Sequence, residues 1–365
     1  MKKIILLVLS LGLAIGPAGA LALIANPAAL ISDDAQLESL NTITNLDGGR
    51  LYVMDYTADY MLDEALAAGI STLEDLMVFV RDNMVGGGNI PYQSQSFACS
   101  AFAAATAEGG VLFGRNFDYK MDMTAMLIRT TPPEGYRSLS LVDMGWLGYG
   151  IGSLDDGATD LSAAIGAPYA LMDGMNEKGL AVTVLLLHDK PTRQDTGKTK
   201  IGTTVAMRLM LDKAATVEEA IALLERYDMQ SSMEQVSFHF MLADATGRVA
   251  VVEYCDNVLE ILEENKVTNY YLSPTMAGLG HGQDRYAILE AALAFKANTL
   301  TRFEAMALLS LVSQQETEES TSMTQWSALY DLSQKHVTVA IRSDFSRQFS
   351  FSLDDISGRE QEQSR

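Results

Sequence analysis

The chain has 365 residues, of which 48% are hydrophobic and 20% are charged, a composition that is typical of a globular protein with a sizeable core and excludes a largely disordered chain. The formal net charge is −21. An acidic surface of this size repels phosphate backbones and anionic headgroups, so the sequence argues against nucleic acid as a partner.

Residues 1–24 have the pattern of a secretory signal peptide. Lys2 and Lys3 precede a long apolar run, and small residues follow in "AGA" and "ALA". The run to Ile24 is also long enough to span a bilayer as an uncleaved anchor, but the glycines and the proline inside it favour a processing site. We therefore expect a secreted or extracytoplasmic bacterial protein, with such an anchor as its only membrane contact.

Residues 25–98 are predicted to form a small helical segment that ends in a flexible linker. Residues 26–50 read as loop. Two stretches then have helical patterns: 57–70 and 71–84. Ser71 and Glu74 have the spacing of a capping box for the second of these helices. The Gly-rich, uncharged stretch 85–96 follows, and its composition is typical of an exposed linker.

After this linker, strand patterns alternate with helical ones. The strand-like runs are 99–106, 111–119, 136–144, 180–188, 236–244, 248–254, 257–264, 327–343 and 347–353. The helical runs are 202–214, 216–227, 284–297 and 301–312. Capping boxes begin at Thr216 and Thr301. Sheets covered by helices, an α+β layered domain, are predicted for residues 99–352, with a polar, frayed tail over 353–365.

Cys99, one of two cysteines in the chain, opens a predicted hairpin. If Glu108 and Gly109 form a two-residue turn, Cys99 lies opposite Asp118. If the turn shifts by one residue, Cys99 lies opposite Lys120. Either register brings the carboxylate of Asp118 within a couple of residues of the thiol across the ladder.

Arg115 and Asp118 would face opposite sides of a regular strand. Both can reach the thiol only if this strand is bulged or leaves the sheet, and Gly114 makes such a distortion cheap. An arginine beside a thiol lowers the thiol pKa. The alternative is a surface Arg–Asp pair, which contributes little to stability.

A nucleophilic cysteine also needs a base, which is usually histidine. The four histidines are His188, His239, His281 and His336, and none is in a recognisable catalytic setting. If the chain is cut between Ala98 and Cys99, the new α-amino group, with a pKa of about 7.7–8.0, can serve as the base. Alternatively, Cys99 and Cys255 pair in a disulfide.

The stretch that begins at Cys99 resembles the N-terminal-nucleophile hydrolases of the choloylglycine hydrolase and linear amide C–N hydrolase group. These enzymes open with Cys, a Gly-containing turn and "GRN-x-D-(Y/F)", which here are Cys99, "EGG" and "GRNFDY". The segments "DGMNEKGLAV", "VTNYYLSP" with "GQDRYAIL", and "QWSALYDLSQKHVTVAI" are also similar and follow in the same order. The long segment before Cys99 is more similar to the acid ceramidase and N-acylethanolamine acid amidase branch.

The resemblance implies a four-layer αββα sandwich, in which helices cover two stacked antiparallel sheets. It implies that Cys99 is the nucleophile and, after cleavage, the amine base. Arg115 would position and acidify the thiol, and Asp118 would accept a hydrogen bond from the α-ammonium group. Asn269 would donate its amide to the oxyanion, a role that suits a neutral side chain, and Arg285 would orient the site. The scheme needs no cofactor and no metal.

The sequence departs from this family at one position. Bile-salt hydrolases place an asparagine a few residues after "NEKGL", whereas this chain has "VTVLLLH", with Leu186 at that position by simple counting. The second oxyanion donor therefore has no assigned side chain. Asn176 reads as a turn residue, and Cys255 as a small strand residue.

These observations predict a secreted, self-processing amidase that cleaves a linear, non-peptide C–N bond in an N-acylated small molecule, such as an N-acyl lipid or a bile-acid conjugate. An acyltransferase of the same fold is one alternative. The other is a secreted lipid-binding protein with a Cys99–Cys255 disulfide and no catalytic activity.

Overall fold

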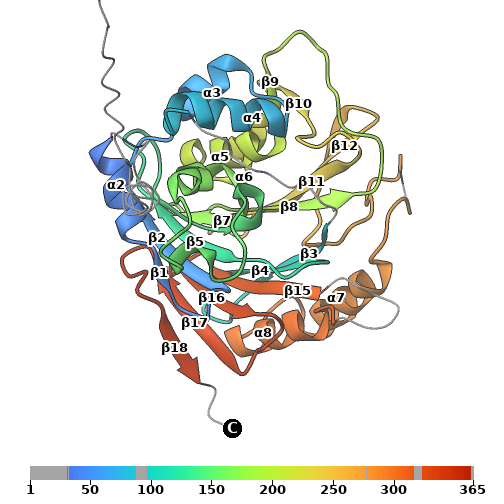
Figure 1. Cartoon of the computed structure of the whole chain (residues 1–365). Helices are drawn as coiled ribbons and strands as arrows, with labels where there is room; N and C mark the ends of the chain where they lie inside the picture. The colour runs from blue at the N-terminus through green and yellow to red at the C-terminus, as the bar shows by residue number, and fades with distance from the viewer. Residues whose placement is uncertain (1–30, 32, 88–96, 277, 316–322, 363–365) are drawn as a thin grey trace, which may run out of the picture.

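The computed structural model describes residues 31, 33–87, 97–276, 278–315 and 323–362. The predicted signal peptide and residues 88–96 of the predicted linker lie outside this part of the chain. The described residues form four layers, in which two sheets are stacked between an upper and a lower group of helices (Figure 1). Within these residues, no helix combines the length and the hydrophobicity needed to cross a membrane.

The larger sheet, which we call sheet I, contains nine strands. In spatial order they are β1 (Thr44–Asn45), β2 (Leu51–Tyr56), β5 (Ala125–Thr130), β6 (Ser138–Asp143), β7 (Leu171–Asn176), β8 (Ala181–Leu187), β11 (Ser237–Ala243), β12 (Val249–Cys255) and β13 (Val258–Leu262). All neighbouring pairs are antiparallel except β2 and β5, which are parallel. Every residue of β6, β7 and β8 is buried, because both faces of the sheet are covered.

Sheet II contains seven strands, all paired antiparallel. In spatial order they are β14 (Lys266–Val267), β3 (Phe97–Ala105), β4 (Val111–Tyr119), β15 (Met323–Asp331), β16 (His336–Ile341), β17 (Arg347–Ser352) and β18 (Arg359–Glu362). A separate parallel pair joins β9 (Lys200–Gly202) and β10 (Asp228–Gln230). The strand β18 lies in the C-terminal tail that we expected to be frayed.

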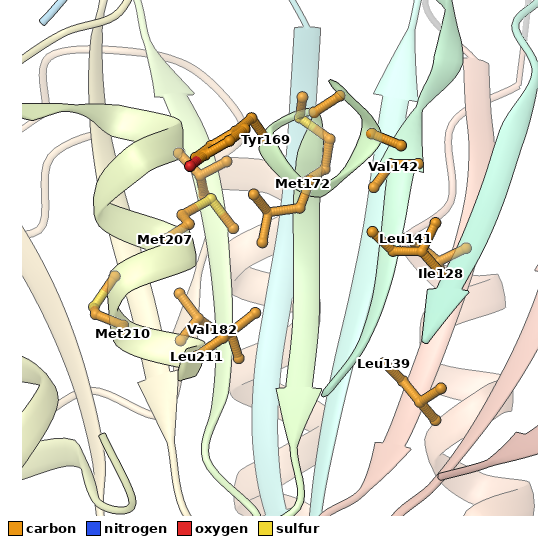
Figure 2. Packing of buried hydrophobic residues seen from close by; sticks show 14 of the residues in the cluster. Ile128, Leu139, Leu141, Val142, Tyr169, Met172, Val182, Met207, Met210 and Leu211 are labelled. Carbon is orange, nitrogen blue, oxygen red and sulfur yellow. The ribbon is translucent and has the colours of Figure 1, made fainter. Parts of the chain in front are cut away.

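Helices cover the outer face of each sheet. On the side of sheet I they are α2 (Asp34–Asn41), α3 (Leu62–Ala68), α4 (Leu73–Phe79), η1 (Val80–Met84), η2 (Met144–Leu147), η3 (Ser153–Asp155), η4 (Ser162–Tyr169), α5 (Thr203–Lys213) and α6 (Val217–Leu224). Against sheet II lie α7 (Gln283–Phe295) and α8 (Arg302–Leu311). Met207, Met210 and Leu211 of α5 pack over the apolar side chains of the sheet I strands (Figure 2).

The capping boxes fix where two of these helices begin. Thr301 and Glu304 form the predicted box of α8. In α4 the box is formed by Thr72 and Asp75, one residue later than the predicted pair Ser71 and Glu74. Both pairs combine a hydroxyl with a carboxylate three residues later, so the sequence pattern does not distinguish them. In α6, Thr216 accepts the N3 amide as predicted, but the side chain of the N3 glutamate binds the amide of residue 215 instead.

The N-terminal segment is not only helix and loop, as the sequence pattern suggested. Its strand β2 joins sheet I beside β5, and α2 lies within the region that was predicted as loop. Tyr60 of this segment donates a hydrogen bond to the Asp212 carboxylate in α5 at 2.6 Å, and Tyr169 donates to the Tyr60 carbonyl at 2.7 Å. Residues 33–87 are therefore part of the same core as the rest of the chain.

Candidate active site

The hairpin that begins near Cys99 has a three-residue loop. Thr106 donates its backbone N–H to the carbonyl of Gly110, and Gly109 lies in the left-handed region at φ 84°. A loop of this length needs a residue with positive φ, which glycine supplies without steric cost. As a result Cys99 pairs with Phe117, so the predicted register with Asp118 is wrong by one residue and the register with Lys120 by three.

The strands β3 and β4 pair without a bulge over their whole length. Side chains of directly paired residues, and of residues two apart, lie on the same face of a sheet. Cys99, Phe117 and Arg115 therefore face inward, between the two sheets, whereas Asp118 faces the helices. The distortion at Gly114 that would let both charged groups point at the thiol is not present.

Arg115 is fully buried and crosses from sheet II to sheet I. Its Nε lies 3.1 Å from Oδ2 of Asp173 on β7 and donates to Thr183 Oγ1 at 2.9 Å on β8. Its Nη2 donates to the carbonyl of Val184 at 3.2 Å, and its guanidinium lies over the Phe117 ring, 4.7 Å from the centroid. The guanidinium is thus fixed beside the strand pair that carries Cys99.

Asp173 is a site residue that the sequence reasoning missed, although it opens the "DGMNEKGLAV" segment. Its carboxylate accepts hydrogen bonds from Trp326 Nε1 at 3.0 Å and from the Tyr330 hydroxyl at 2.5 Å, both on β15. Burial raises the pKa of this carboxyl, and the Arg115 guanidinium opposes that rise. The signal in the sequence was a carboxylate in an otherwise apolar run, but nothing there identified its partner.

Three other predicted site residues, Asp118, Asn269 and Arg285, meet around the backbone of Cys99. Arg285 Nη1 donates to the Cys99 carbonyl at 2.6 Å and lies 3.2 Å from Asp118 Oδ2. Arg285 Nη2 donates to Asn269 Oδ1 at 3.1 Å, and the Cys99 N–H donates to the same oxygen at 2.6 Å. Thr324 Oγ1 donates a hydrogen bond to the other oxygen of the same carboxylate, Asp118 Oδ1, at 2.5 Å.

Asn269 is fully buried and is held on both sides of its amide. While its oxygen accepts the two bonds described above, its Nδ2 donates to the carbonyl of Leu186 at 2.8 Å. A primary amide nitrogen carries two hydrogens, and this bond uses one of them. Leu186 itself is a buried residue of β8 whose side chain cannot donate, so it supports Asn269 only through its backbone.

The thiol of Cys99 has no exposed surface in the intact chain. Burial raises the pKa of Cys99 to about 12, and the nearby guanidinium of Arg115 only partly offsets this increase. Arg115 thus lowers the thiol pKa, as expected, but in the intact chain the pKa is still raised, because removal of the thiolate from water outweighs the attraction of one cation.

The second cysteine is not bonded to the first. Both are free and buried, Cys99 in sheet II and Cys255 at the end of β12 in sheet I. Cys255 Sγ lies 4.0 Å from Oε2 of Glu253, whose other oxygen lies 3.1 Å from Nδ1 of His239. Among the residues that the structure describes, no group of three or more His, Cys, Asp or Glu side chains has the arrangement of a metal site.

A cavity of about 250 Å³ lies at the end of β4, close to this site. Tyr119 forms part of its wall, and the Tyr119 ring stacks on the Phe117 ring with centroids 6.1 Å apart. Tyr119 lies two residues along β4 from Phe117, the residue opposite Cys99, so the cavity is next to the hairpin that carries the thiol.

The sequence of residues 99–275 matches the family of linear amide C–N hydrolases, choloylglycine hydrolase family. A stretch of 117 residues is 36% identical to a penicillin V acylase of Pectobacterium atrosepticum, and this match covers 28% of the present chain and 30% of that relative. The chain thus spans less than a third of the length of this relative.

Two solved structures show the extent of the structural similarity. A variant of conjugated bile acid hydrolase from Clostridium perfringens superimposes with a TM-score of 0.50 and 18% identity, over 73% of this chain and 97% of the other. Penicillin V acylase from Agrobacterium tumefaciens gives a TM-score of 0.47 and 21% identity, over 70% and 86%. Residues 99–275 are therefore similar in sequence to the choloylglycine hydrolase family of linear amide C–N hydrolases, and the α+β fold of the described residues is similar to that of a conjugated bile acid hydrolase.

Proposed function

We propose that this protein is an exported amidase that cuts itself between Ala98 and Cys99 and then hydrolyses a linear, non-peptide amide bond. The observation that carries the proposal is the network around the Cys99 backbone. Asn269 Oδ1 accepts the N–H of Cys99, and Arg285 binds its carbonyl, each at 2.6 Å. A cysteine that acted only through its thiol would not need its main-chain nitrogen held by buried side chains.

The chemistry of self-cleavage follows from this placement. The Cys99 thiol attacks the carbonyl carbon of Ala98, the acyl chain moves from nitrogen to sulfur, and water hydrolyses the thioester. The products are a carboxylate at Ala98 and an α-amino group on Cys99. This new amine takes the position of the former N–H beside Asn269, close to Asp118 and Arg285. The nucleophile and its base are then carried by the same residue.

Turnover of a substrate repeats the same steps on another carbonyl. The α-amine accepts the thiol proton, the thiolate attacks the substrate amide, and the second hydrogen of Asn269 Nδ2 stabilises the oxyanion. The proton moves to the leaving amine, and water clears the thioester. Arg115 stays beside the thiol and stabilises the developing thiolate. Passage of the acyl group to another amine in place of water would make the same site an acyltransferase.

The buried state of Cys99 explains why the intact chain would be inactive. With no exposed surface and a pKa of about 12, the thiol is protonated and inaccessible. Cleavage cuts β3 between its second and third residues and supplies the missing base. The segment 33–87 would stay bound as a second chain, because β2 is hydrogen-bonded to β5 and Tyr60 to Asp212. This two-chain product is our reason for proposing a place near the acid ceramidase branch.

The substrate class that we propose is an N-acylated small molecule, such as an N-acyl lipid or an acyl conjugate of an amino compound. The relatives named above are a penicillin V acylase and a conjugated bile acid hydrolase, and both names fit this class. The cavity beside Tyr119 has Met121 and Met123 in its wall, and Met121 is half exposed at its mouth. Flexible thioether side chains of this kind accommodate apolar groups of varied shape.

Amine release from a panel of N-acyl amides, measured together with chain cleavage, tests the proposal. We expect the wild-type protein to separate into two chains on a denaturing gel, the second of which begins Cys-Ser-Ala-Phe. Cys99→Ala should remain a single folded chain without activity. Cys255→Ser is the matched control, since it removes the other buried free cysteine, and it should keep both cleavage and activity. Amide hydrolysis that persists in Cys99→Ala would show that another group is the nucleophile.

A further inference from the structure

The cavity at the end of β4 combines aromatic and acidic side chains. Its wall is formed by residues from the end of β4, the loop after it, and the turn that contains η2: Tyr119, Met121, Asp122, Met123, Asp143, Gly145, Gly148, Tyr149 and Gly150. This set has two phenol rings and two carboxylates, and none of its members is a lysine, an arginine or a histidine. The glycines leave room because they have no side chain to fill it.

Of the two carboxylates, Asp143 is the one without a cationic partner. Its side chain is 1% exposed, its Oδ1 accepts the backbone N–H of Gly145 at 2.8 Å, and N–H groups of Trp146 also interact with the carboxyl. It takes part in no ion pair with the described residues. Asp122, in contrast, is half exposed at the rim and is paired with Arg342. Neutral N–H groups satisfy the hydrogen bonds of Asp143 but do not balance its charge, so a cationic ligand in the cavity would supply the missing counter-charge.

Helix capping alone does not account for this residue. Asp143 is the N-cap of η2, a single turn of four residues. Asparagine or serine at this position would accept the same N–H bond without the cost of burying a charge. The charge itself therefore needs a function that the cap does not provide.

The size of the cavity limits what it can hold. At about 250 Å³ it is smaller than the roughly 300–1,000 Å³ of pockets that enclose a whole drug-sized ligand. It can hold one end of a substrate while the scissile amide lies at Cys99, on the far side of Phe117. Carboxylate oxygens and the faces of tyrosine rings are the groups that bind ammonium ions in proteins.

We propose that this cavity is a specificity pocket of the amidase and that Asp143 makes it accept a positively charged amine group at one end of the substrate. The inference rests on the function proposed above. An anionic group in the same place would face the Asp143 carboxylate in a poorly solvated site, and a purely alkyl group would leave that carboxylate without a partner. Substrates with a cationic end should therefore be preferred over matched anionic and neutral ones.

The charge of the pocket should also depend on pH. Burial raises the pKa of Asp143 to about 7. Burial also raises the pKa of Tyr119 and of Tyr149, so both phenols stay neutral in the same range. The remaining charged groups at the cavity are Asp122 and its partner Arg342 at the rim. The preference for a cationic end should thus increase from pH 6 to pH 8, as Asp143 loses its proton.

The test uses the mature protein and matched amides that differ only in a terminal ammonium, methyl or carboxylate group, on the acyl side in one series and on the amine side in another. For the wild-type protein we expect kcat/KM to favour the ammonium end by about tenfold or more. Asp143→Asn keeps the cap and removes the charge, and it should abolish this preference. Glu108→Gln, an equal change in net charge at the exposed hairpin loop, should leave the preference intact.

A binding measurement separates this proposal from the proposed function. Phenethylammonium and phenylacetate contain no amide, and calorimetric titration of each into mature wild-type and Asp143→Asn protein measures the pocket without turnover. Ammonium binding that requires Asp143 supports the pocket even if no amide is hydrolysed. If both proteins hydrolyse amides with the same ammonium preference, the pocket proposal is wrong and the proposed amidase function is retained. If Asp143→Asn does not fold, an ammonium preference of the wild type that stays flat from pH 6 to pH 8 overturns it.

Discussion

The pairs Arg115–Asp173 and Arg208–Asp212 are built from the same two residue types and are almost equally buried. In each, the guanidinium is fully buried, the carboxylate is at most 1% exposed, and a tyrosine hydroxyl donates to the carboxylate. Each arginine also has one nitrogen, Nη1, without a hydrogen-bond partner among the described residues. Their surroundings differ.

Arg208 and Asp212 lie one turn apart on α5, so they would meet in any folded form of that helix. Arg115 and Asp173 lie on different sheets, and they meet only when β4 is stacked over β7. The first pair fastens the N-terminal segment through Tyr60, whereas the second fixes a cation beside Cys99. The comparison shows that equal burial and equal chemistry serve structure in one place and, under our proposal, catalysis in the other.

Of the changes to these two pairs, Asp173→Asn should have the largest effect, since it should lower both stability and turnover. Removal of the charge leaves Arg115 buried without a counter-ion, which costs about 3–5 kcal/mol of stability. The guanidinium also loses the group that orients it, and a displacement of about 1 Å at a reacting centre can lower turnover about 10²-fold. Amine release per folded molecule, with folding followed by urea denaturation, measures both effects. Normal turnover in the folded fraction would remove Arg115 from the mechanism.

Asp212→Asn is the matched change in the other pair. The loss of stability should be similar, about 3–5 kcal/mol, because Arg208 is left equally uncompensated in the core. Turnover per folded molecule should stay within about twofold of the wild type, since α5 lies outside sheet I and away from Cys99. If Asp212→Asn lowers turnover as much as Asp173→Asn, the two pairs do not differ in function.

Tyr60→Phe is the mildest change and probes only the link between the N-terminal segment and α5. It removes one hydrogen bond to a buried carboxylate, and bonds to charged groups contribute about 1.5–3 kcal/mol. In the cleaved protein we expect the N-terminal chain to dissociate at a lower urea concentration than in the wild type, as followed by gel filtration. Tyr52→Phe is the control, because its hydroxyl binds Asp155 at the surface turn instead. An unchanged dissociation midpoint in Tyr60→Phe would mean that β2 alone holds the segment.

The elements that the sequence predicted best are those with a strong local pattern. The run 111–119 is a strand with the predicted bounds, and α8 begins at the predicted cap. The strands β5 and β7 were not predicted. In β7 the stretch "LMDGMN" contains Asp, Gly and Asn, which disfavour strands, and it is held in the sheet by neighbours on both sides. The strand β2 was missed for a related reason, since its partner β5 lies about seventy residues away in the chain.

The candidate site also contains residues that the sequence predicted and one that it did not. Local spacing placed Cys99 and Asp118 near each other, and the family resemblance added Asn269 and Arg285, which the structure brings to the Cys99 backbone. Asp173 has no sequence signal that connects it with Arg115. The effect of Arg115 on the pKa of Cys99 was predicted, but the larger and opposite effect of burial was not, because a neighbouring charge is visible in a hairpin pattern and complete burial is not.

The sequence by itself thus determined most of the residues to which we assign a role, apart from Asp173, because hairpin turns, helix caps and a cysteine followed by "GRNFDY" depend on residues close together in the chain. Only the tertiary structure decided how they work together. The stacking of the two sheets pairs Arg115 with Asp173 and buries the Cys99 thiol, and the packing of α7 delivers Arg285 to the Cys99 carbonyl. Contacts between segments tens of residues or more apart depend on how whole layers pack, and desolvation of a group depends on everything that surrounds it.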